Sequence, residues 1–197
     1  YIKVNKIRLS DMKNWILTNK NIFHKSKSYF SIIGVMVSAK SREVNYWNQP
    51  LIKNSSPHFG GFLIKKINST THYLVKYIVE PGLKYGSLTC TVKTSNVKNY
   101  KKNNNLSSKS KFILQDFFFK KNKSSIKYDV VQSHEGGRFY QSQIRYMVVQ
   151  IKNNQDIKID KSYKWISQNQ MIDLIKKGTL DIEARLCFAC YNFDKII

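Results

Sequence analysis

Long apolar runs are missing from this sequence. The longest, from Tyr29 to Val37, is interrupted by Ser31 and Gly34 and is much shorter than the roughly 20 residues that a membrane-spanning helix needs. The chain opens at Tyr1 without the charged and then apolar leader by which an export signal is recognised. We therefore expect a cytoplasmic protein with no membrane partner.

Cysteine is also scarce. The three cysteines, Cys90, Cys187 and Cys190, are an odd number and too few for a disulfide framework. Cys187-x-x-Cys190 has a spacing found in metal sites, but no second pair and no nearby His complete the four ligands of a closed zinc site. The same spacing suits two residues on one buried helical face. We expect structural cysteines and no bound metal.

Acidic residues are few, with 12 against 34 basic residues and a formal net charge of +22. Such an excess favours an anionic partner: nucleic acid, an anionic membrane or a phosphorylated small molecule. Only five of the basic residues are Arg, and the Lys residues are scattered through Asn- and Ile-rich sequence. Nucleic-acid surfaces usually combine clustered cations with a good share of Arg. We expect no nucleic-acid partner, and that alternative rests on charge alone.

Several strands are predicted in the first three quarters of the chain. A short helix is predicted from Ser10, with Met12, Trp15 and Ile16 on one side. A segment rich in Asn, Ser and Lys, residues 95–110, is predicted to be a flexible loop. A hairpin turn is predicted at 68–71. The predicted strands are 29–38, 60–67, 72–79, 88–93, 127–131 and 140–151.

The C-terminal part is predicted to be helical. Ser167 is a suitable cap for a helix that ends at Gly178, and Asp181 begins a last helix. A small helix, several strands and a helical pair predict a single α+β domain over residues 1–197. The apolar sides of the two helices are predicted to be Met171, Leu174 and Ile175 in the first, and Ile182, Leu186, Ala189 and Phe193 in the second.

The scarcest charged residues are concentrated in short blocks. The sequence has four Glu and five Arg, and all the Glu and four of the Arg lie in these blocks. Arg makes a planar two-pronged contact with phosphate or carboxylate that Lys cannot reproduce. The concentration therefore indicates sites rather than general surface charge. The blocks are residues 41–50, 79–82, 135–145 and 183–185.

The blocks resemble the motifs of the nucleotide-sugar 2,3-dehydratase family. Family members have a Ser-Arg-Glu-Val stretch leading through Trp to Gln-Pro-Leu, a Val-Glu-Pro-Gly turn, an Asn-Tyr pair, and Gln-Ser-Glu-Glu-Gly-Gly-Arg-Phe before an Arg-Tyr strand. They end in a Trp segment and an Ala-Arg helix. In order, the corresponding residues here are 41–51, 79–82, 99–100, 132–139, 145–146, Trp165 and 184–185. Residues 24–34 are similar to the first strand of a repeat, so the resemblance spans nearly the whole chain.

The sequence departs from the family in three ways. His134 replaces the first Glu of the family's Glu-Glu pair, and Cys90 and Lys93 stand where relatives more often have Pro and Gln. Family members contain two tandem repeats, whereas this sequence resembles one. Three alternatives stay open: a complete single-repeat enzyme, half of a two-repeat enzyme, and a non-catalytic module that binds nucleotide sugar.

The resemblance implies a Nudix-like fold, a mixed sheet flanked by helices, in a single repeat. The Nudix hydrolase signature is missing, so metal-dependent pyrophosphate cleavage is not expected. The family reaction removes water across C2 and C3 of a nucleotide-linked 4-keto-6-deoxyhexose and needs no cofactor. A base removes the C3 proton, the enolate is stabilised, and an acid assists the departing C2 hydroxyl.

The resemblance also suggests which residues act. Glu135 is the candidate base, and His134 and Tyr140 are the candidate acids; Arg138 neutralises the pyrophosphate or the enolate, unless it pairs structurally with Glu135. Tyr46 or Trp47 stacks on the nucleobase. The complete set of expected substrate-binding residues is Arg42, Tyr46, Trp47, Gln49, Glu80, Gln132, Gly136, Gly137, Arg138 and Arg145.

The tandem architecture of the family suggests that each repeat presents an apolar surface to another. We expect a homodimer that imitates the fused pair about a two-fold axis. The predicted contact is the C-terminal helix around Leu186 and Phe193, or an edge of the sheet. The other expected partners are the nucleotide-diphosphate sugar and a separate 3-ketoreductase that takes up the product.

Overall fold

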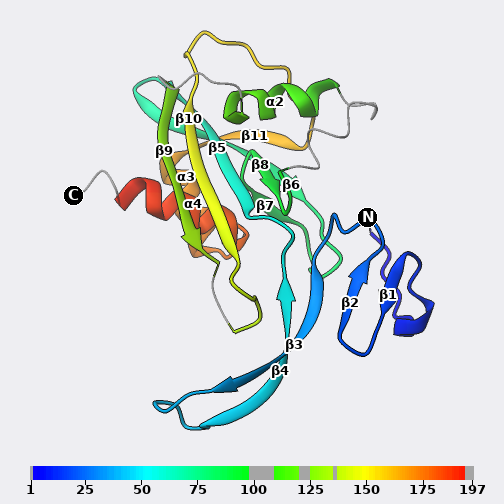
Figure 1. The fold of residues 1–197 in the computed structure, drawn as a ribbon. Helices are drawn as coiled ribbons and strands as arrows, with labels where there is room; N and C mark the ends of the chain where they lie inside the picture. The colour runs from blue at the N-terminus through cyan, green and yellow to red at the C-terminus, as the bar shows by residue number, and fades with distance from the viewer. Residues whose placement is uncertain (1, 98–108, 120–124, 135–136, 194–197) are drawn as a thin grey trace.

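A seven-stranded mixed sheet forms the body of the protein (Figure 1). The computed structural model describes residues 2–97, 109–119, 125–134 and 137–193. In this part of the chain, the five main strands follow the order β11-β6-β5-β10-β9, with β7 beside β6 and β8 beside β5. Strands β5 and β10 are parallel, and the other recorded pairs are antiparallel. The bounds are β5 His58–Ile67, β6 Thr70–Ile78, β7 Ser87–Thr89, β8 Val92–Thr94, β9 Ile126–Ser133, β10 Gln143–Gln150 and β11 Tyr163–Ser167.

Helices cover both faces of this sheet, α2 (Lys109–Phe119) on one and α3 (Gln168–Lys176) with α4 (Ile182–Phe193) on the other. Alternate residues of a strand point to opposite faces, and the central strands are apolar at both. In β5, Phe62 contributes to the core under α3 and α4, whereas Leu63 contributes to the core under α2. A Cβ atom at Gly61 would lie 2.6 Å from the Phe118 ring, so this glycine allows α2 to pack closely on the sheet.

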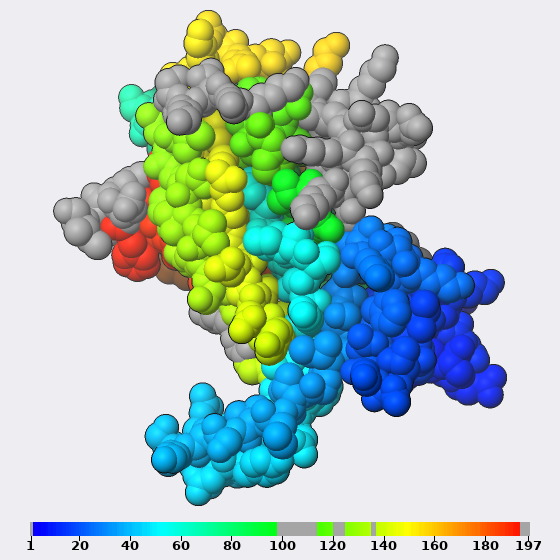
Figure 2. All heavy atoms as spheres, in the orientation of Figure 1, coloured from blue at the N-terminus to red at the C-terminus, as the bar shows by residue number. Residues whose placement is uncertain are grey.

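A smaller antiparallel sheet precedes the body, in the order β1-β2-β3-β4. Its strands are β1 (Trp15–Leu17), β2 (Asn21–His24), β3 (Ser31–Ser38) and β4 (Tyr46–Lys53), after the 3₁₀ turn η1 (Leu9–Asp11). The hairpin of β3 and β4 extends away from the body, at the bottom of Figures 1 and 2. We call residues 34–49 of this hairpin the arm.

Several local predictions are confirmed. The hairpin turn between β5 and β6 is made by Asn68 and Ser69, both with a left-handed φ, of 48° and 64°. Ser167 caps α3 with a reciprocal capping box that includes Gln170, and Gly178 follows the helix with a φ of 67°. The mixed α+β architecture is also confirmed.

Other local predictions were wrong. No α-helix begins at Ser10; after the 3₁₀ turn, Asn14 adopts a φ of 64° and Trp15 enters a strand. There Trp15 packs against His24 and Phe30, a tertiary contact that outweighs the helical spacing. The last helix buries the side containing Ala184, Cys187, Phe188 and Tyr191. Of the predicted apolar side, Leu186 packs against the core, whereas Ile182 and Phe193 are exposed.

Two further differences concern residues 88–119. The strand predicted for 88–93 is divided into β7 and β8, because Thr91 turns inward between β5 and β6. Its hydroxyl accepts a hydrogen bond from the Leu63 amide at 2.9 Å and donates one to the Leu74 carbonyl. The loop predicted for 95–110 falls mainly on residues 98–108, which lie outside the described residues, and Lys109 and Ser110 already belong to α2.

Candidate functional site

The base of the arm pairs with residues 137–140, which come much later in the chain. The Ile52 amide donates to the Arg138 carbonyl at 2.7 Å, and the Tyr140 amide donates to the Ile52 carbonyl at 2.9 Å. These bonds form a short parallel bridge between Ile52 and Phe139. Two of the blocks singled out in the sequence therefore lie side by side, although neither neighbours the other in the chain.

Side chains strengthen this pairing. The Gln49 amide donates to the Gly137 carbonyl at 2.6 Å, and the Gln49 Oε1 atom accepts from the Trp47 indole at 2.9 Å. Both ends of the Gln49 side chain are thus engaged, one on the arm and one on the turn. The Lys53 ammonium lies 5.8 Å from the centre of the Tyr140 ring. The structure brings together five of the residues predicted for the site, Trp47, Gln49, Gly137, Arg138 and Tyr140.

Two histidines meet next to this turn. His134 follows β9, and His58 begins β5; their ring centroids are 4.8 Å apart, edge to face. His134 also stacks on Phe139, at 4.4 Å with 20° between the ring planes, and its amide donates to the Ser142 carbonyl at 2.9 Å. The His58 Nε2 atom is buried and has no hydrogen-bond partner among the described residues.

The surroundings of His58 keep its ring neutral. Burial lowers its pKa to about 4, and the nearby His134 and Lys93 lower it in the same direction. A neutral imidazole with a free nitrogen can accept or donate a proton. Sequence reasoning missed His58, because a lone His before an apolar strand carries no motif; its proximity to His134 depends on the pairing of β5 with β10 and of β10 with β9.

A partly buried ion-pair cluster around Lys93 lies close enough to His58 to affect its pKa. The Lys93 ammonium is 3.0 Å from Asp181 Oδ2, 3.2 Å from Glu80 Oε1 and 3.2 Å from Glu183 Oε2. Burial acts to lower the pKa of Lys93, but the Asp181, Glu183 and Glu80 carboxylates outweigh it and raise the pKa well above its ordinary value. Asp181 Oδ1 also accepts from the Ala184 amide at 2.9 Å, so Lys93 holds the residue that caps α4.

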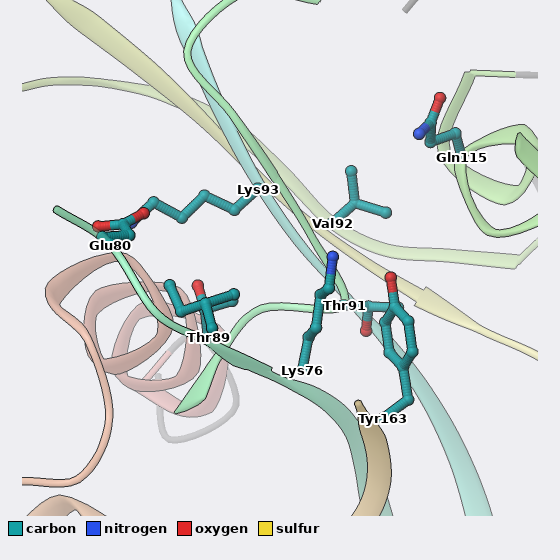
Figure 3. A pocket seen from close by; sticks show the side chains of 9 residues that line it. Lys76, Glu80, Thr89, Thr91, Val92, Lys93, Gln115 and Tyr163 are labelled. Atoms are coloured by element: carbon teal, nitrogen blue, oxygen red, sulfur yellow. The ribbon is translucent and has the colours of Figure 1, made fainter. Parts of the chain in front are cut away.

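Figure 3 shows how this cluster borders a small hollow between β6 and β8. Glu80 and Lys93 meet at one end, and Lys76 points toward Tyr163 at the other. The hollow has a volume of about 130 Å³. Thr89 faces it with a buried hydroxyl that has no hydrogen-bond partner among the described residues. Glu80, an expected substrate-binding residue, is thus already bound to Lys93.

Other predicted site residues point elsewhere. The Gln132 amide contacts the Tyr128 hydroxyl at 3.3 Å and Cys190 Sγ at 3.4 Å, under α4. Arg145 makes a two-pronged pair with Asp129, both distances being 2.6 Å. Arg42 and Tyr46 are exposed on the arm, where Arg42 and Trp47 line an open hollow of about 670 Å³. Glu135 and Gly136 lie outside the described residues.

The cysteines are free thiols; Cys90 and Cys187 are buried in the core under α3 and α4, as expected for structural residues. Among the described residues, no group of three or more His, Cys, Asp and Glu side chains is placed to hold a metal ion. In the same part of the chain, no helix is long and apolar enough to cross a membrane.

Solved structures similar to this chain include a C. elegans Ap4A hydrolase, with 11% identity, a TM-score of 0.41, and coverage of 75% of this chain and 99% of that one. A Nudix hydrolase from M. smegmatis has 10% identity and a TM-score of 0.41, over 82% of this chain and 96% of that one.

Curated relatives are more similar in sequence. The protein of Amycolatopsis orientalis is 30% identical over 193 residues, which are 97% of this chain and 40% of that protein. The protein of Saccharopolyspora spinosa is 29% identical over 185 residues, 93% of this chain and 37% of that one. Both are named dTDP-4-dehydro-6-deoxy-alpha-D-glucopyranose 2,3-dehydratase. This chain spans about two fifths of their length.

The motif blocks that meet at the base of the arm and around Lys93 all fall within one family match. The model of the NDP-hexose 2,3-dehydratase family matches residues 1–191 of the 197 residues. The chain belongs to the NDP-hexose 2,3-dehydratase family.

Proposed function

We propose that this chain is a unit of a lyase that removes water across C2 and C3 of a nucleotide-linked 4-keto-6-deoxyhexose. The observation that carries the proposal is the family match over residues 1–191. The relatives named above act on a dTDP-linked 4-keto sugar according to their names, and a dTDP sugar is the substrate that we propose here.

The proposed chemistry needs only groups that a protein supplies. The C4 ketone acidifies the C3 proton, and a base takes that proton to leave an enolate. The enolate electrons form the C2–C3 double bond as the C2 hydroxyl leaves with a proton from an acid, so that water departs. The resulting enol tautomerises to a 3,4-diketo-2,6-dideoxy sugar.

We propose Glu135 as the base, because it corresponds to the second Glu of the family's Glu-Glu pair. His134 and Tyr140 are the proposed acids, and His58 is added as a neutral imidazole against His134. Arg138 is the proposed partner of the pyrophosphate or the enolate. The pairing of Arg138 and Tyr140 with Ile52 supports these roles, because it fixes the backbone of the turn that carries them.

The remaining predicted residues fit the proposal in different ways. Gln49 and Trp47 brace the turn through the Gly137 carbonyl. Arg42 and Tyr46 are proposed ligand contacts from the exposed arm. Glu80, Gln132 and Arg145 are engaged within the chain, so their proposed role is to order the surroundings of the site. Gly136 stays a proposed substrate-binding residue.

Activity measurements on two variants test the roles. The chain is incubated with dTDP-4-keto-6-deoxyglucose, excess chelator and a ketoreductase that traps the product. Glu135→Gln should lower turnover by roughly 10²- to 10⁴-fold with unchanged affinity, because a base acts mainly in the transition state. Arg138→Lys should weaken binding as well, since Lys cannot form the forked contact.

The exposed carboxylate Asp156 supplies the control, and Asp156→Asn should behave as wild type. Near-normal turnover of Glu135→Gln would remove Glu135 as the base. Binding of dTDP-sugar without any turnover by the wild-type chain would favour the second candidate, a non-catalytic binding module or half of a two-repeat enzyme. The observation behind this candidate is that the chain spans about two fifths of its relatives' length.

We also propose that two copies associate. The exposed side of α4, with Ile182 and Phe193, and the exposed Met36 and Tyr46 of the arm are apolar surfaces that a second repeat or copy would cover. A downstream 3-ketoreductase and a cytoplasmic location stay predictions, and both follow from the proposed product and substrate.

A further inference from the structure

An aromatic hollow lies in the smaller sheet, between β2 with its following turn and the end of β4, at residues that no motif singled out as a binding site. Its volume is about 330 Å³, and it is lined by residues of β2, of the turn after β2, and of the segment 53–55. This is the size range of pockets for small molecules.

The aromatic rings of the hollow are exposed but held in place. Tyr29 is 52% exposed and Phe30 is 40% exposed, although both are large aromatic side chains. Tyr29 packs edge-on against His24, with the ring centroids 4.7 Å apart. The Trp15 ring packs against both His24 and Phe30, with ring centroids 5.5 Å and 5.1 Å apart. Exposed rings with a fixed orientation suit a planar ligand, because stacking then costs little ordering.

Two lysines line the hollow, and hydrogen bonds of a buried asparagine hold its two sides together. Lys27 and Lys53 line the hollow, so it combines aromatic faces with positive charge. The buried Asn96 amide donates to the Ser28 carbonyl at 3.0 Å and to the Ser55 hydroxyl at 3.2 Å. These bonds tie the turn after β2 to the segment that follows β4 and keep the two walls together.

The hollow is connected to the histidine pair. Asn54 lines it and donates through Nδ2 to the Ser142 hydroxyl at 2.6 Å. The same hydroxyl lies 3.3 Å from His134 Nδ1. Lys53, also in its lining, has its ammonium above Tyr140. A ligand in the hollow would therefore be linked to both candidate acids, to His134 through Asn54 and Ser142, and to Tyr140 through Lys53.

We propose that this hollow binds the nucleoside diphosphate part of the substrate, with the base against Tyr29 and Phe30 and the phosphates near Lys27 and Lys53. The inference rests on the proposed function and specifies where the nucleotide sits. A thymidine diphosphate combines a planar base with two anionic phosphates, which matches the combination of rings and ammonium groups.

The rival location is the hollow of the arm, where the sequence placed the base on Tyr46 or Trp47. There the Trp47 indole nitrogen is already bound to Gln49, and the hollow is open and lined by a single aromatic side chain. The hollow at Tyr29 offers more ring surface and a direct connection to His134.

Calorimetric titrations of the chain with dTDP, thymidine and inorganic pyrophosphate, in excess chelator, test this location. The double variant Tyr29→Ala/Phe30→Ala should bind dTDP and thymidine roughly 5- to 100-fold more weakly, as expected for a lost base stack. Its pyrophosphate binding should be unchanged. The double variant Lys27→Gln/Lys53→Gln should weaken dTDP and pyrophosphate but not thymidine.

Two controls make the result specific. Tyr85→Ala removes a more exposed tyrosine outside the hollow and should bind dTDP as wild type does. If the double aromatic variant unfolds, Tyr29→Ala alone carries the test. Wild-type affinity in the aromatic variants, or loss of binding in Trp47→Ala alone, overturns the location but leaves the proposed function standing. A wild-type chain that binds neither dTDP nor the dTDP-sugar overturns both.

Discussion

Replacing Lys93 with methionine would remove the ammonium group around which three carboxylates gather. Methionine keeps most of the side-chain volume, so the loss is mainly electrostatic. Asp181 and Glu183 are little exposed, at 8% and 12% of their side chains, whereas Glu80 is 44% exposed. The variant would leave two nearly buried carboxylates and one half-exposed carboxylate facing one another without a cation.

Removing one partner of a buried ion pair costs about 3–5 kcal/mol. Solvent screens Glu80, so we take the lower end, about 3 kcal/mol. For a chain of 197 residues, each kcal/mol shifts the melting temperature by about 2–4 °C, so Lys93→Met should melt about 6–12 °C below wild type at pH 7. Lys93→Gln keeps a hydrogen-bond donor and should lose less.

The dependence on pH gives a second check. The pKa of Lys93 is raised in the folded state, so its contribution to stability is fully present at neutral pH and is lost only as the pH rises through that raised pKa. The gap between wild type and Lys93→Met should therefore stay constant from about pH 7 to about pH 9. Thermal unfolding followed by circular dichroism measures both effects.

The matched control is Lys164→Met, at an exposed position of β11 in the same sheet, which should change stability by less than about 0.5 kcal/mol. A Lys93→Met protein that melts within about 2 °C of wild type at pH 7 would refute the assigned role of the cluster.

Two further predictions concern His58 and assembly. Because the pKa of His58 falls from 6.5 to about 4 on folding, the unfolded chain binds the proton more readily, and wild type should lose stability as the pH falls between these values. His58→Gln should lose less over that range in urea titrations at pH 7 and pH 4.5, and an equal loss would contradict the burial of a neutral ring. Light scattering should find a dimer that persists at low salt and that Phe193→Glu weakens; a monomer of about 23 kDa at micromolar concentration with full activity would contradict the dimer.

Features that depend on neighbouring residues could be predicted from the sequence. The cap of α3 involves Ser167 and Gln170, three residues apart, and the helix is followed by a left-handed glycine. Such interactions form within one turn, so the residues themselves determine them. The turn at Asn68 and Ser69 is local in the same sense. The family motifs likewise marked residues 41–51 and 132–139, two segments that the structure joins through Gln49 and Gly137.

The composition of the site was decided by tertiary structure. His58 meets His134 only because β5 and β9 flank β10 in one sheet, and a lone histidine gives no sign of this. Lys93 gathers carboxylates from two separate segments, with Glu80 after β6 and both Asp181 and Glu183 at the start of α4. Trp15 lies in a strand rather than a helix because it packs on His24 and Phe30. Contacts of this kind depend on strand order and burial, which a local pattern of residues cannot determine.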